Sequence, residues 1–217
     1  DIKDETTMFQ EYPPTEQYAF QLTGSKFFSV ERVNLAFARA QEQQPLHFRY
    51  KFGMHFEQTQ FLDTSENNSE LQMWQPPDPE GVYVVAGDPA YGSSEWADEF
   101  AIQVLRCFSD RVVQVAQYHT TDITEAQFAW VIAHLAGSYG TQNQPAMVIL
   151  EMMGPGGAVF NELQNLKRYA GPRTAATGDM YDVVSRQRDY LWRKPDSVFG
   201  GLSYQWQTNQ KEKLRMM

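Results

Sequence analysis

The chain has 217 residues, of which 42% are hydrophobic and 14% aromatic, enough for the core of one domain with at most an appendage. Cys107 is the only cysteine, so no internal disulfide can form, which fits a reducing, intracellular setting. No apolar run approaches the roughly 18 residues of a membrane span, and no signal peptide is visible, so we expect no membrane partner. The net charge of −9 opposes nucleic acid as a partner of the whole surface. Residues 161–217, however, hold 10 Lys and Arg against 6 Asp and Glu, which predicts a local basic face.

The first part of the chain, residues 1–81, is interpreted as a linker or adaptor segment and not as an independent core. It contains one predicted helix near Val30–Ala40, whose apolar positions Val33 and Phe37 would be buried. The run at 76–81, Pro-Pro-Asp-Pro-Glu-Gly, cannot form a helix or an inner strand and marks a junction. We therefore place the start of the compact domain, 82–217, at Val82.

Two apolar runs that each end in an acid are the most informative feature of that domain. Residues 82–86 predict a strand buried on both faces, and Asp88 follows it. Residues 147–150 repeat the pattern and lead into Glu151, then Gly-Pro-Gly-Gly and a helical pattern. Neighbouring strands would place the two carboxylates side by side, where hard oxygen ligands suit Mg²⁺ or Mn²⁺ better than zinc. The alternative is that the two acids cap separate turns.

The elements between the two runs predict the fold class. Residues 100–108 and 111–118 form a predicted β-hairpin, and a helix follows with Thr124 as its cap and Gln127 in the capping-box position. An antiparallel meander followed by a crossover helix can bring the fourth strand beside the first. This is the ribonuclease H-like plan: an α/β fold with a mixed five-stranded sheet, in which residues 199–204 would supply the fifth strand, and flanking helices. None of the four histidines has metal-ligand spacing, and Trp130 and His134 are interpreted as a packing pair.

Several ordered segments resemble the C-terminal nuclease domain of phage terminase large subunits: residues 12–24, 71–77, 82–92, 97–98, 147–157, 205–209 and 213–214. The resemblance implies two-metal hydrolysis of concatemeric double-stranded viral DNA during genome packaging, in the host cytoplasm, with Mg²⁺ or Mn²⁺ as cofactor. It implies the portal and the small terminase subunit as partners. By position, Asp88 and Glu151 match two of the three catalytic carboxylates, and Asp98 matches a supporting metal ligand.

The sequence departs from the family pattern in two ways. It contains no Walker A motif, so we expect no ATPase activity from this chain. The third carboxylate of the family would follow Leu214 by several tens of residues, so we expect an incomplete site with feeble activity in residues 1–217. Two alternatives stay open. One is a non-catalytic packaging or interaction module, and the other is an actin-like Mg-nucleotide phosphotransferase, for which residues 151–154 would make a poor phosphate loop.

Overall fold

The computed structural model describes residues 29–91, 98–141, 145–168, 190–192, 194–195 and 202–203. The chain divides into two compact units, residues 1–44 with 215–217, and residues 45–214. In the first unit, helix α3 (Val30–Gln41) confirms the predicted helix. The expected burial is wrong, because Val33 and Phe37 are 40% and 50% exposed. Residues 29–44 are all that the structure describes of this unit, and they offer α3 no second element to pack against.

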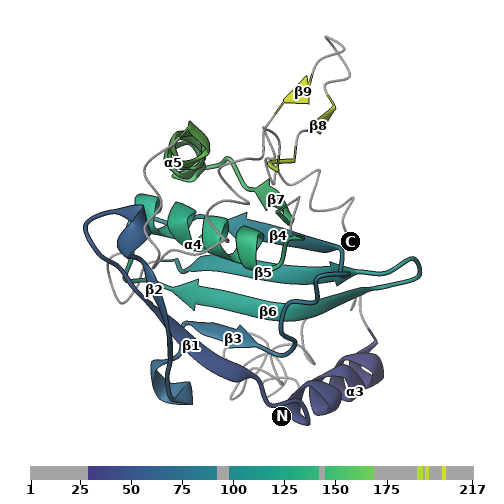
Figure 1. The fold of residues 1–217 in the computed structure, drawn as a ribbon. Helices are drawn as coiled ribbons and strands as arrows, with labels where there is room; N and C mark the ends of the chain where they lie inside the picture. Colours follow the sequence, from purple (N-terminus) through teal and green to yellow (C-terminus); the bar gives the residue numbers. More distant parts are fainter. Residues whose placement is uncertain are drawn as a thin grey trace, which may run out of the picture. The chain divides into compact units, whose positions relative to one another are not determined.

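The second unit is built on one mixed sheet of seven strands, in the order β2-β1-β3-β6-β5-β4-β7 (Figure 1). The described residues of this unit also form two short 3₁₀ turns, two α-helices and a separate two-stranded sheet. The strands of the large sheet are β1 (Leu46–Lys51), β2 (Gln60–Asp63), β3 (Leu71–Met73), β4 (Tyr83–Asp88), β5 (Phe100–Cys107), β6 (Val112–Thr120) and β7 (Met147–Leu150). The other elements are η1 (Phe56–Gln58), η2 (Glu66–Asn68), α4 (Glu125–Ser138), α5 (Gly156–Arg168), β8 (Lys194–Pro195) and β9 (Leu202–Ser203).

The central strands have the ribonuclease H-like order that the sequence predicts. Strands β4, β5 and β6 form an antiparallel meander, and β7 lies parallel to β4 after the crossover through α4. The sheet is larger than the five strands expected, because β3 pairs with β6 and carries β1 and β2 with it. Leu71 and Met73 of β3 are buried against this edge. The compact domain is expected to start at Val82, and the strands β1, β2 and β3 of the sheet precede that residue.

Of the strand expected at residues 199–204, the structure describes only Leu202 and Ser203. Leu202–Ser203 is β9 and pairs with β8 in the separate sheet, and residues 199–201 and 204 lie outside the described residues. Residues 190–192 lie beside β7 instead, where the Val148 amide donates to the Tyr190 carbonyl (2.8 Å) and the Trp192 amide donates to the Val148 carbonyl (2.7 Å). Tyr190 and Leu191 are both buried, which suits this edge better than the Gly-rich run.

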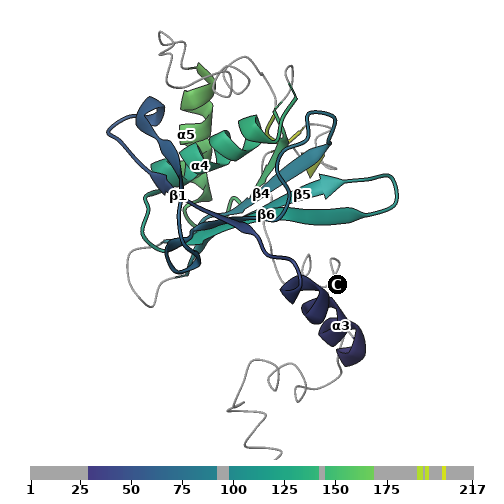
Figure 2. The ribbon, with the colours of Figure 1, turned by 60° about the horizontal axis from the view of Figure 1, so that its bottom comes forward.

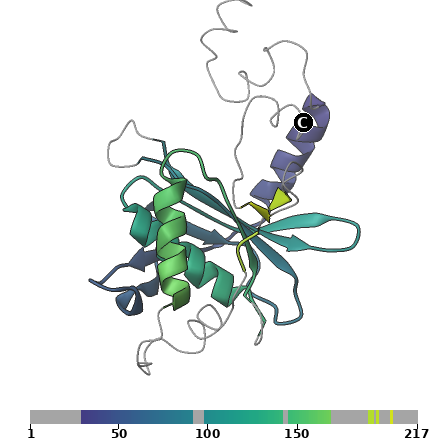
Figure 3. The same ribbon diagram turned by 90° about the horizontal axis from the view of Figure 1, so that it is seen from above.

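Helices α4 and α5 cover one side of the sheet (Figures 2 and 3). The predicted capping box is confirmed: the Gln127 amide donates to the Thr124 hydroxyl (3.3 Å), and the Thr124 amide donates to the Gln127 side chain (2.9 Å). None of the described helices is both long and apolar enough to cross a membrane. The apolar positions that face the core from α4 and α5 are Phe128, Val131, Ile132, Leu135, Val159, Leu163 and Leu166, all buried.

Candidate functional site

The two faces of strand β4 differ in burial. Tyr83, Val85 and Gly87 are buried, whereas the alternate residues are half-buried, and Asp88 is exposed. A Cβ atom on Gly87 would lie 3.0 Å from Cδ1 of Ile132 in α4, so Gly87 faces the helix. Because successive residues of a strand point to opposite faces, Asp88 points away from α4.

Strand β7 repeats this alternation beside β4. Val148 and Leu150 are buried, and Glu151 is half-buried. The parallel register pairs Gly87 with Leu150, and the Glu151 amide donates to the Gly87 carbonyl (3.0 Å). The next step of the same register sets Glu151 beside Asp88. Each apolar run thus delivers its terminal acid to the same place on the sheet.

Asp88 and Glu151 line one open depression, with a volume of about 330 Å³. It lies on the face of the sheet opposite α4. Its walls come from the three adjacent strands β5, β4 and β7, and carry no histidine or cysteine. The other lining residues are Ala86, Gly87, Ala101, Gln103 and Ile149.

The turn after β7 explains why glycines follow Glu151. Gly154 has φ +58°, in the left-handed region that glycine adopts without a steric penalty. A Cβ on Gly156 would collide with the Glu151 carbonyl oxygen, so only glycine lets α5 begin directly against that residue. The Gly-Pro-Gly-Gly run therefore fixes the backbone position of one of the two acids.

The remaining sequence-predicted residues are placed differently. Asp98 is exposed, lies ahead of β5 and does not line the depression; the residue of this segment opposite Asp88 is Ala101. Within the described ranges, no group of three or more His, Cys, Asp or Glu side chains is arranged to hold a metal ion. Four basic residues of the predicted C-terminal basic face, Arg186, Arg188, Lys211 and Lys213, lie outside the described residues.

Gln103 is the polar residue of the depression that the sequence analysis did not single out. It lies in β5, opposite Ala86 of β4. The signal was present, because Gln103 is a polar residue between buried Ile102 and Val104 in an otherwise apolar run. Its relation to Asp88, however, depends on the pairing of β4 with β5, which the sequence does not state.

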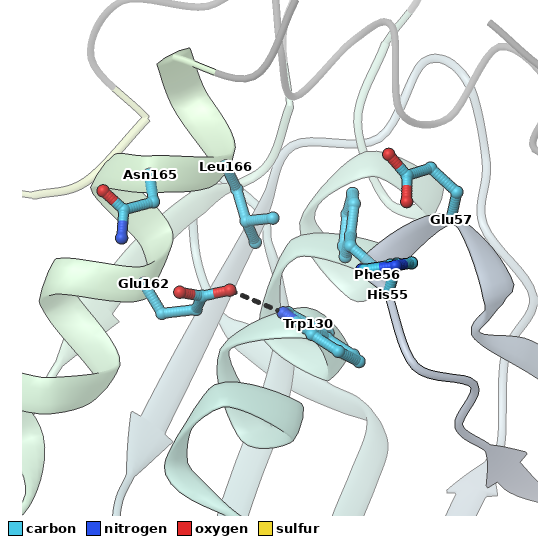
Figure 4. Close-up of a pocket in the computed structure, with 7 residues that line it drawn as sticks. All are labelled: His55, Phe56, Glu57, Trp130, Glu162, Asn165 and Leu166. Atoms are coloured by element: carbon cyan, nitrogen blue, oxygen red, sulfur yellow. Dashed lines mark hydrogen bonds between the residues drawn. The ribbon is translucent and has the colours of Figure 1, made fainter. Parts of the chain in front are cut away.

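A second cavity, of about 170 Å³, lies between η1, α4 and α5 (Figure 4). Trp130 of α4 donates its indole N–H to Glu162 Oε1 of α5 (2.8 Å), and this bond joins the two helices. His134, one turn further along α4, is 4% exposed and packs edge-on against Tyr50 and Phe56. Burial lowers the pKa of His134 to about 3, so it is neutral at pH 7. Trp130 and His134 are both held by packing on the helix-covered side.

No family model matches the chain, and no curated protein matches it. The solved structures that match include two of the large terminase nuclease from the thermophilic phage G20c. The one with bound zinc is 17% identical with a TM-score of 0.38, over 55% of this chain and 64% of that chain. The other is 16% identical with a TM-score of 0.37, over 55% and 59%. Both are phage terminase nucleases.

The chain thus spans less than two thirds of the length of either terminase structure. Those structures belong to the family that the sequence resembles. Likeness at this level adds nothing about the chemistry of Asp88 and Glu151. The roles of the two acids are therefore inferred from the residues that surround them in this chain.

Proposed function

We propose that this chain is the nuclease part of a phage large terminase and acts as a metal-dependent endonuclease on concatemeric double-stranded DNA during genome packaging. The observation that supports this most is the pairing of β4 with β7, which brings Asp88 and Glu151 into one solvent-open depression of a ribonuclease H-like sheet. Two adjacent carboxylates repel each other, and a cation between them relieves that repulsion. The arrangement suits metal-assisted hydrolysis better than a pair of turn caps.

The donor atoms of the depression fit a hard divalent cation. The acids offer carboxylate oxygens, and neither histidine nor cysteine is among the lining residues, which favours Mg²⁺ or Mn²⁺. Asp88 and Glu151 would hold this cation, and Asp98 would support it only if the segment before β5 moved closer. When bound, the cation supplies Lewis-acid stabilisation of the phosphodiester and makes water more acidic. A second cation, which the family resemblance implies, belongs to the same proposal.

The residues around the two acids hold Glu151 in place and leave Asp88 accessible to a phosphodiester. Glu151 is held at its backbone by the bond to Gly87 and at its carbonyl by the close approach of Gly156. Ala86 and Ala101 flank Asp88 with small side chains, so the bulky backbone of DNA can approach the carboxylate. A rigid acid beside an accessible one is the arrangement that positioning of a substrate requires.

Double-stranded DNA is the proposed substrate, and the portal and small terminase subunit are proposed partners, acting in the host cytoplasm. With a net charge of −9, the chain should bind duplex weakly and with a steep dependence on salt. We expect little preference for sequence, because the described residues that line the depression all come from the strands of the sheet, with no helix or ribbon among them to enter a groove and read base edges.

Calorimetric Mn²⁺ titration and plasmid nicking in Mn²⁺ test the proposal. We expect Asp88→Asn and Glu151→Gln each to weaken Mn²⁺ binding by roughly tenfold or more, because each removes one charged ligand, and to abolish nicking. Asp110→Asn is the matched control, since Asp110 is an exposed acid that pairs with Arg111 in the β5–β6 turn. If both acid variants bind Mn²⁺ as tightly as the parent, the metal site is elsewhere. If the parent binds no Mn²⁺, the chain is a non-catalytic module.

A further inference from the structure

Four glutamines form a connected row on the face of the sheet that carries Asp88. Gln72 of β3, Gln117 of β6 and Gln103 of β5 occupy paired positions on three adjacent strands. The Gln117 amide group donates to Gln72 Oε1 (2.8 Å). Gln114 Nε2 donates both to Gln117 Oε1 (3.1 Å) and to Gln103 Oε1 (2.5 Å).

A β-bulge makes the row continuous. The register between β5 and β6 shifts between Val104 and Leu105, so Gln114 lies on the same face as Gln117 although the two are three residues apart. Without the shift, an odd spacing along a strand would put them on opposite faces. The bulge therefore completes a polar row that ends at the depression.

In this row the Gln103 amide turns its oxygen toward Gln114. A glutamine NH₂ group has two hydrogens, and Gln114 directs one to each neighbour, so both neighbours must turn their oxygen atoms toward it. Gln103 then has its own NH₂ group at the other end of its amide. Gln103 lines the depression with Asp88 and Glu151, and no hydrogen bond between described residues uses its Nε2 atom.

We propose that Gln103 Nε2 binds a non-bridging phosphate oxygen of the DNA backbone at this depression, and that Gln114, Gln117 and Gln72 hold its amide in the binding orientation. This inference rests on the proposed nuclease function and adds a substrate-binding residue to it. A neutral donor has an advantage over lysine or arginine here. A cationic side chain would pair with Asp88 or Glu151 and compete with the divalent ion, whereas an amide binds phosphate without reducing their charge.

The test combines Gln103→Leu and Gln103→Glu with Gln72→Leu as the matched control at the far end of the row. For nicking of plasmid DNA in Mn²⁺, we expect Gln103→Leu to raise KM about tenfold, the size of one lost hydrogen bond, with a smaller change in kcat. Mn²⁺ affinity by calorimetry should stay at the parent value. Gln72→Leu should change KM by less than about twofold, because it loses only the last bond of the row.

Gln103→Glu keeps an oxygen that accepts from Gln114, so it preserves the row while replacing the donor with a charge. We expect KM to rise further than in Gln103→Leu, because the new carboxylate repels phosphate, and Mn²⁺ affinity to stay equal or increase. Unchanged KM in both Gln103 variants overturns the inference. Weaker Mn²⁺ binding by Gln103→Leu with unchanged KM also overturns it, since the amide then holds a carboxylate and not DNA.

Binding of a fluorescein-labelled duplex in EDTA, followed by anisotropy at low salt, separates this inference from the proposed function. A parent chain that binds duplex but does not nick it refutes the nuclease proposal alone. Weaker duplex binding by Gln103→Leu, but not by Gln72→Leu, then still supports the phosphate contact. Equal duplex binding by the parent and Gln103→Leu, or no binding by the parent, overturns the contact.

Discussion

The two faces of the central sheet are formed by the same strands, but one face packs in the core and the other is accessible to a ligand. On the side of α4, alternate residues such as Val85, Ile102 and Tyr118 are fully or almost fully buried. On the other side, their neighbours Ala86 and Gln103 line the acidic depression. A strand has a period of two, so one residue of each neighbouring pair serves the core and the other remains accessible to a ligand.

This division separates the energetic roles of the residues. Burial of apolar side chains against α4 and α5 contributes most of the stability, at about 25 cal/mol for each Å² removed from water. The accessible face contributes little of this and concentrates like charges at Asp88 and Glu151. Substitutions on the covered face should therefore change the free energy of unfolding, and those on the accessible face should change binding and activity.

The largest expected effect is on the covered face. Phe128 is fully buried and packs against the Phe100 ring, with centroids 4.9 Å apart. We expect Phe128→Ala to lower the free energy of unfolding in urea by about 3–5 kcal/mol, through lost burial and the cavity left behind. Gln117→Ala on the accessible face should cost less than about 1 kcal/mol. Similar losses from the two variants would contradict the division between the faces.

A smaller effect is expected where the two faces meet. Gly156→Ala would place a methyl group against the Glu151 carbonyl, which we expect to cost about 1–3 kcal/mol as overpacking and to weaken Mn²⁺ binding by moving Glu151. Gly157→Ala is the matched control, because a Cβ at Gly157 meets nothing within 4 Å and alanine favours the helix. Urea unfolding and calorimetry give both readouts. Unchanged Mn²⁺ binding in Gly156→Ala would show that the turn does not position Glu151.

The third expected effect is a pH dependence of stability, which grows gradually as the pH falls. Burial lowers the pKa of His134 in the folded state to about 3 from the ordinary 6.5, so the unfolded chain binds the proton more readily between these values. Stability from this group is complete above pH 6.5 and falls as the pH drops toward 3, by up to about 1.4 kcal/mol per pH unit. His134→Phe should reduce that slope, measured by urea unfolding between pH 7 and pH 4.5.

The pH profile of His134→Phe has to be subtracted from that of the parent, because protonation of Glu70 has the opposite effect on stability. Burial raises the pKa of Glu70, so its protonation favours the folded state as the pH falls. Identical pH profiles of the parent and His134→Phe would mean that folding does not change the pKa of His134, and would contradict the lowered pKa.

The sequence predicts the central elements because their signals are local. Uninterrupted apolar runs identify β4 and β7, and the spacing of Thr124 and Gln127 identifies the start of α4. The alternation of Phe48 and Tyr50 with Arg49 and Lys51 was an available signal for β1 that the interpretation of residues 1–81 as a linker passed over. Strands of two residues, such as β8 and β9, are too short to carry a periodic pattern.

The candidate site is predictable only in part. The acids that end two apolar runs are visible in the sequence, and the ribonuclease H-like order makes them neighbours. The place of Asp98 outside the depression and of Gln103 inside it depends on cross-strand register. The place of Gln114 in the row depends on a different register, that of β5 with β6, which shifts at a bulge between Val104 and Leu105 that no local sequence pattern predicts.

The parallel pairing of β4 with β7 also sets when the two acids meet during folding. Strands β5 and β6 form a local hairpin and α4 nucleates on its own capping box, but β7 must close a long loop before it reaches β4. During synthesis, β4 therefore stays unpaired on its β7 side while the hairpin and the helix form. Asp88 and Glu151 remain far apart for most of that time, and their mutual repulsion opposes only the last docking step. We expect divalent cations, by binding at the proposed site, to accelerate that step and so raise the rate of folding.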